Sequence, residues 1–175
     1  MKLRVVAALL ICLLSSFAWG ADECRLALSP AGVDFGSVNR AELLARSVSG
    51  GADASLGVRS LHLRIQCAVP RAMTWGFAAP VADPQRYRWT AGTLQIRMVA
   101  ARLDGVAVQM KRTGDEVVEA NLLRPGDRVV TWRSGAVASG SHLEVDLQIE
   151  ARVDEASSRV RDLTRHEAYG TFQLD

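Results

Sequence analysis

The sequence has little of what would mark a membrane protein or a nucleic-acid-binding protein. Beyond its first 20 residues, no segment approaches the roughly 18 uninterrupted apolar residues of a membrane-spanning helix. Its 21 Lys and Arg residues nearly balance its 19 Asp and Glu residues. Without a basic surplus or a stripe of Lys and Arg, the long-range attraction to phosphates is missing. We therefore expect no nucleic-acid partner.

Groups that carry catalysis or bind metals are also scarce. The histidines are His62, His142 and His166, and each takes a polar position of an alternating strand or lies in a charged loop. No histidines have H-x-x-H spacing and no dense group of carboxylates suggests a metal site. No serine stands in a G-x-S-x-G setting. We therefore expect no catalytic residue, no metal and no cofactor, and the protein is not predicted to be an enzyme.

Residues 1–20 have the order of a secretory signal peptide. MKLR is basic, VVAALLICLLSSFAW is apolar, and Ala18 and Gly20 are small, as export and cleavage require. Removing Lys2 and Arg4 with this segment takes the 21 basic residues to 19, equal to the 19 acidic ones. We predict an exported chain of residues 21–175 that forms one domain and is not inserted in a membrane.

Cysteine is rare, and its placement is informative. Cys12 lies in the predicted signal peptide, which leaves Cys24 and Cys67. An even pair in an exported protein can form a lasting disulfide, and each cysteine stands beside alternating apolar residues of a predicted strand. We expect a disulfide here, the alternative being two buried free thiols.

Alternation of apolar and polar residues predicts several strands. The longest pattern runs from His142 to Val153, a second from Val58 to Val69 ends at Pro70, and Asp104-Gly105 marks a hairpin between two others. Short strands are expected at 25–28, 73–77, 129–132 and 168–174, and the segments 78–92 and 135–141 are expected as loops. The pattern predicts an all-β protein, an antiparallel β-sandwich.

Aromatic residues offer a weak case for ligand binding. Trp75, Trp89, Trp132 and Tyr87 could line a sugar-binding surface, although core filling is the favoured interpretation for each. Arg86 to Trp89 lie together in a segment rich in turn residues, so they are the best candidates for a receptor contact.

Four pieces of the sequence together resemble a fimbrial subunit of the chaperone–usher type. They are CRLALSPAGVDFG from Cys24, LHLRIQC ending at Cys67, the hairpin ARLDGVAV, and the terminal AYGTFQLD. The resemblance covers most of the chain after the signal peptide, and it rests on the order and spacing of the pieces. It implies an incomplete immunoglobulin-like sandwich that lacks its last strand, with Cys24 and Cys67 joining the first two strands.

The same resemblance implies partners and a site. A periplasmic chaperone strand would fill an apolar groove and would later be replaced, at the usher, by the extension of another fimbrial subunit. The chain would pass through the periplasm to the fimbrium at the cell surface and contribute to adhesion. The expected groove residues are Leu26, Leu28, Ala168, Gly170, Phe172 and Leu174.

Two features depart from the family pattern. Leu174 stands where the family has a penultimate tyrosine, and only Ala21 to Glu23 separate the predicted cleavage site from Cys24. At about 3.3 Å per residue this segment is too short to donate a strand, so we expect a subunit that accepts one, as at a fimbrial tip. The alternative is a self-sufficient exported binding domain whose sandwich is already closed, and the apolar loop from Val117 to Leu123 could close it.

Overall fold

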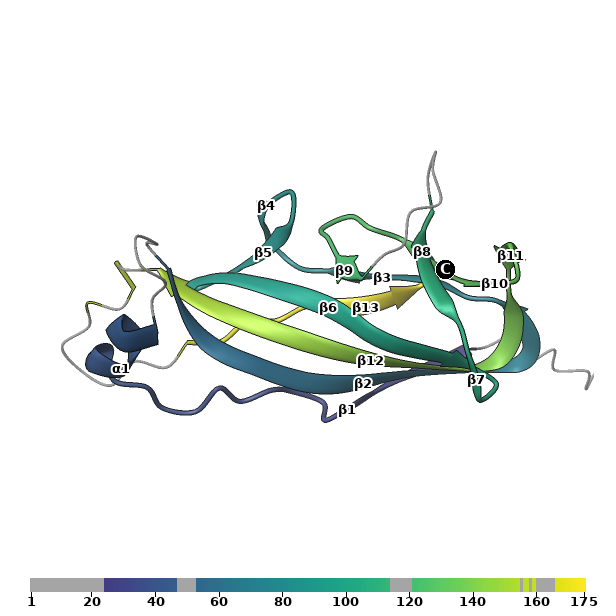
Figure 1. Ribbon diagram of the computed structural model, residues 1–175, viewed down its shortest axis with the longest axis horizontal. Helices are drawn as coiled ribbons and strands as arrows, with labels where there is room; N and C mark the ends of the chain where they lie inside the picture. The colour runs from purple at the N-terminus through teal and green to yellow at the C-terminus, as the bar shows by residue number, and fades with distance from the viewer. Residues whose placement is uncertain (1–23, 47–52, 114–120, 155, 158, 160–165) are drawn as a thin grey trace, which may run out of the picture.

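The computed structural model describes residues 24–46, 53–113, 121–154, 156, 157, 159 and 166–175. In these residues two antiparallel β-sheets pack face to face, and a short helix lies at one end (Figure 1). The predicted fold class, an all-β antiparallel sandwich, is confirmed. The signal peptide expected at 1–20 and the residues Ala21 to Glu23 lie outside the described residues.

The larger sheet is built on two long strands. They are β2 (Asp53–Ala72) and β12 (Ser139–Asp154), which pair over most of their length because both alternate apolar and polar residues. The sheet order is β1 (Cys24–Ser29), β2, β12, β6 (Gly92–Leu103), β5 (Arg86–Trp89) and β4 (Val81–Asp83), and β7 (Val106–Ala107) and β9 (Leu122–Leu123) pair with β6.

The smaller sheet covers one face of the larger one. Its order is β11 (Ala136–Val137), β10 (Val129–Arg133), β3 (Thr74–Ala78) and β13 (Thr171–Leu174), and β8 (Gln109–Arg112) also pairs with β10. The core lies between the two sheets, where alternate residues of each strand meet. It contains Leu63, Ile65, Leu143 and Val145 from the larger sheet and Trp75 and Val129 from the smaller one.

A helix that the sequence did not predict, α1 (Arg40–Arg46), follows β1. Asn39 and Glu42 cap its start reciprocally, since each accepts a hydrogen bond from the other's backbone N–H at 3.0–3.1 Å. Leu43 is buried against Ala54 and Val153. Seven residues are too few for a clear helical period. No helix in the described part of the chain has the length and hydrophobicity to cross a membrane.

Several predicted limits of strands and loops were wrong. β2 continues through Pro70 to Ala72 because the register with β12 shifts between Gly140 and His142, so the proline lies beside a bulge, where a strand tolerates it. Two segments predicted as loops also contain strands: 135–141 contains β11 and the start of β12, and 78–92 contains β4 and β5. Ser134 and Gly135 both have positive φ, which suits the tight turn of a β10–β11 hairpin.

Gly92 lies where β6 meets the backbone of β12. Its φ is +152°, and a Cβ there would overlap the carbonyl oxygen of Arg152. We expect Gly92→Ala to lower the free energy of unfolding by about 2–3 kcal/mol, from backbone strain plus overpacking. Gly135 is the matched control, since its φ is +85° with no atom within 4 Å. Denaturant unfolding should show a smaller loss for Gly135→Ala, and equal losses would refute the steric argument.

Candidate functional site

The side of the sandwich bounded by β1 and β13 is the first candidate site, and we call it the β1–β13 side. In the described residues β1 pairs only with β2, and β13 pairs only with β3. On the opposite side the chain passes from β6 through β7 to β8, which pairs with β10, so the two sheets are connected there. Figure 1 shows β13 on the β1 side of β3. Both strands therefore end their sheets on the same side.

Four of the predicted groove residues lie on these two strands with their side chains turned to the core. They are Leu26, Leu28, Phe172 and Leu174. Each is only half-buried. Three of their partners on the next strands are closed off, since Ile65 opposite Leu26 is 0% exposed, Leu63 opposite Leu28 is 1% exposed, and Trp75 opposite Leu174 is 0% exposed. The fourth partner, Phe77 opposite Phe172, is itself half-buried. The apolar rows on both edges therefore lack the cover that inner strands have.

The other two predicted groove residues precede β13. The strand was expected from residue 168 but begins at Thr171, so that prediction was wrong for its first half. Ala168 and Gly170 are exposed, so Ala168 does not face the core as predicted. Gly170 lies so close to Phe77 that a Cβ there would overlap the ring. Gly170 therefore leaves no room for a side chain at the point where the chain enters β13.

Aromatic side chains fill the core beneath β13. The ring of Phe77 is 4.8 Å from Phe172 and 5.1 Å from Tyr87, and Phe172 is 6.0 Å from Trp75. Burial raises the pKa of Tyr87, with the nearby charge of Asp127 a smaller cause. Within the described part of the chain, the Tyr87 hydroxyl and the Trp75 indole N–H have no hydrogen-bond partner. Trp75 and Tyr87 are core residues, as the sequence favoured, whereas Trp89 and Trp132 are half-buried.

The predicted disulfide between Cys24 and Cys67 is present. The two cysteines are direct partners in the β1–β2 ladder, 43 residues apart in sequence. The bond holds one edge of the β1–β13 side to the body of the larger sheet.

The loop considered as an internal closure does not reach this side in its described part. Leu122 and Leu123 form β9, which pairs with Arg97 and Ile96 of β6. The strand β6 is separated from β1 by β2 and β12. Residues 117–120 lie outside the described residues.

Histidines 62 and 142 lie on the outer face of the larger sheet. The Nδ1 atom of His62 lies 2.6 Å from a carboxylate oxygen of Asp146, and Nε2 of His142 lies 3.3 Å from Glu144. The hydrogen bond from His142, followed by one from Arg64, lowers the pKa of Glu144. The His166 and Trp89 rings pack in a T-shaped arrangement, with ring centroids 6.0 Å apart. These are pairwise surface contacts.

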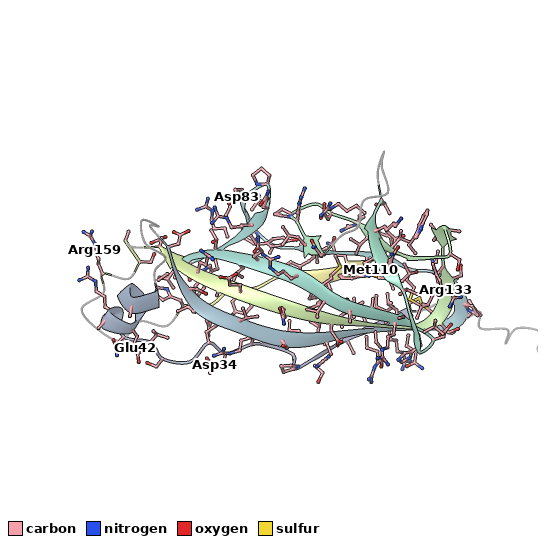
Figure 2. All side chains as sticks on the ribbon, in the orientation of Figure 1. Asp34, Glu42, Asp83, Met110, Arg133 and Arg159 are labelled. Carbon is pink, nitrogen blue, oxygen red and sulfur yellow. A yellow bond between two sulfur atoms is a disulfide. The ribbon has the colours of Figure 1, made fainter. Side chains whose placement is uncertain are left out.

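A second candidate site is a polar hollow of about 550 Å³ on the outer face of the larger sheet, beside the β4–β5 hairpin. Its floor is formed by β6 and β12, with Thr93 opposite Arg152 and Gln95 opposite Glu150. Its wall is the turn from Asp83 to Arg86, which stands out from the sheet with Asp83 labelled in Figure 2. We call this the hairpin hollow.

The segment Arg86 to Trp89, predicted as a receptor contact, is divided by its strand geometry. Arg86 lies in the hairpin hollow, Tyr87 in the core, and Arg88 at the surface. Trp89 is half-buried and donates its indole N–H to the Arg152 carbonyl at 3.0 Å. From the sequence, the floor residues could be identified only as polar positions of alternating strands. The register between β6 and β12 brings them together, and the sequence does not show that register.

In the described residues, no group of three or more His, Cys, Asp or Glu side chains could hold a metal ion. Comparison with known proteins found no matching family model and no matching curated protein.

Proposed function

We propose that this chain is an exported subunit of a chaperone–usher type fimbrium, and that its β1–β13 side accepts a strand from another polypeptide. The partners would be a periplasmic chaperone first, and then the usher and other fimbrial subunits. The site of action would be the fimbrium at the cell surface, where the subunit contributes to adhesion. The role is assembly and binding, with no catalytic step.

The observation that carries this proposal is the pair of half-buried apolar rows on two sheet edges. Each row packs against the core, and no described residue covers its outer side. The rows are Leu26 and Leu28 on β1, and Phe172 and Leu174 on β13. An apolar side chain gains roughly 25 cal/mol for each further Å² removed from water. A strand with apolar residues at alternate positions would cover both rows at once.

The backbones of the same two strands favour an extended partner. An edge strand presents unpaired N–H and C=O groups, which template pairing with another chain and are an aggregation hazard until covered. A partner spanning the six residues of β1 needs about 20 Å of extended chain at about 3.3 Å per residue. Main-chain hydrogen bonds to the edge would provide affinity, and alternate side chains would provide specificity.

The disulfide fits the proposed route. Such bonds form and persist in oxidising compartments, of which the bacterial periplasm is one. Cys24 lies at the start of β1, so the bond holds this edge strand in place before a partner binds.

The test is a peptide that alternates apolar and polar residues, added to the purified chain without residues 1–20. At a peptide concentration about 100 times Kd, we expect the folded state to gain about 2.7 kcal/mol. Calorimetry measures this as a rise in Tm. A peptide of the same composition with proline at its centre should give little gain, because proline lacks the N–H that pairs with an edge.

Two matched variants test whether the peptide binds at the β1–β13 side. Leu28→Asp puts a charge into the apolar row of β1, whereas Val99→Asp changes a side chain on β6 that is 58% exposed. The peptide-induced rise in Tm should be lost in the first and kept in the second. A chain that melts sharply at high temperature without peptide, and that no peptide stabilises, would instead be a self-sufficient binding domain.

A further inference from the structure

The hairpin hollow contains charged side chains that have no role in the proposed binding of a strand. Three guanidinium groups line it, those of Arg86, Arg97 and Arg152, with the carboxylates of Asp83 and Glu150. Its centre lies on the outer face of β6 and β12, whereas the core-facing residues of β1 and β13 lie between the sheets. A ligand here would leave the β1–β13 side free.

Both carboxylates of the hollow are already neutralised. Glu150 accepts hydrogen bonds from Arg152 Nη2 at 3.0 Å and from the Ser55 hydroxyl at 3.1 Å. Asp83 pairs with Arg86 Nε at 2.6 Å, and the Gln85 backbone N–H is the first cause of its lowered pKa. Neither is a strong site for a cation.

One wall is also fixed by a bridge across the sheet. Arg86 reaches back to Asp53 at the start of β2, with Nη1 3.5 Å from the carboxylate. Because Arg86 is held by two carboxylates, the turn that carries Pro84 and Gln85 is held over the floor. The hollow is therefore shaped before any ligand arrives.

Arg97 differs from the other two arginines. Its side chain donates a hydrogen bond from Nη2 to Gln95 Oε1 at 3.0 Å, and no carboxylate of the described residues pairs with it. Gln95 keeps its amide N–H groups for another acceptor. Beside them, the buried Thr93 hydroxyl has no hydrogen-bond partner among the described residues, and such atoms usually find one in a ligand or water. The floor thus offers a surplus of donors and one unpaired positive charge.

We propose that the hairpin hollow binds an acidic sugar residue, with its acid group on Arg97 and its hydroxyls on Gln95 and the hairpin. Guanidinium groups bind carboxylate and sulfate through parallel N–H donors. Pockets for drug-like ligands are mostly apolar, whereas this lining is mostly polar side chains with both donors and acceptors. Such a lining suits a ring with hydroxyl groups, and the volume of about 550 Å³ admits one or two rings.

Three sugars with the same ring test this: methyl β-D-glucuronide, methyl β-D-glucoside 6-sulfate and methyl β-D-glucoside. Their Kd values with the purified disulfide-bonded chain are measured by NMR titration at low salt. We expect at least one acid to bind about tenfold or more tighter than the neutral sugar. The preferred acid distinguishes carboxylate from sulfate, and added salt should weaken its binding.

Arg97→Gln should remove this preference, with about a tenfold loss for the acid and little change for the neutral sugar. Arg133→Gln is the matched control, since Arg133 is also exposed but lies on the β10–β11 hairpin, at the far end of the molecule in Figure 2. Equal losses in the two variants would overturn the proposal. So would equal binding of all three sugars, or no binding of either acid at millimolar concentration.

Discussion

Replacing Cys24 and Cys67 together by alanine is expected to lower the free energy of unfolding by roughly 4 kcal/mol in the chain-entropy model. The bond closes a segment of 43 residues, and opening it returns that loop entropy to the unfolded chain. A small domain is stable by only about 5–15 kcal/mol. Urea unfolding at neutral pH should therefore show a large fall in the midpoint.

The reduced wild-type chain is the control for this variant. Its midpoint should match that of the double variant, because both lack the cross-link and differ only in two small side chains. If reduction lowers the free energy of unfolding of the wild-type chain by less than about 1 kcal/mol, the entropic argument is contradicted. That result would indicate that Leu26 and Leu28 alone keep β1 docked.

The strand pattern was predictable wherever one face is buried along a long strand. From Leu143 to Val153, every second residue faces the core, so a period of two was visible over most of β12, although not over its first residues, Ser139 to Ser141. Asp104-Gly105 was predictable because few dipeptides take positive φ at both positions, as these do. Where an element is short, as in α1, or a proline meets a bulge, as at Pro70, the deciding contact comes from a distant strand.

The two candidate sites differ in how far the sequence could identify them. The apolar rows of the β1–β13 side are local, since Leu26 and Leu28, or Phe172 and Leu174, alternate within one strand. Ala168 was misplaced because alternation alone does not show where a strand leaves its sheet. The hairpin hollow depends on two registers and on a turn anchored to Asp53, more than thirty residues from Arg86. Only the assembled sheet brings these groups together.

Trp75→Ala is expected to lower the free energy of unfolding by about 3–5 kcal/mol, the range for truncating a large buried aromatic. The side chain is 0% exposed, packs between the sheets, and supports Phe172 and Leu174 on β13. Trp75→Phe should lower the free energy of unfolding much less, because it also removes an indole N–H that has no partner in the described core. Trp132 is half-buried under Lys111, so Trp132→Ala, the matched surface control, should lose less than Trp75→Ala. Denaturant unfolding with equal losses at Trp75 and Trp132 would show that Trp75 is not a main support of the core beneath β13.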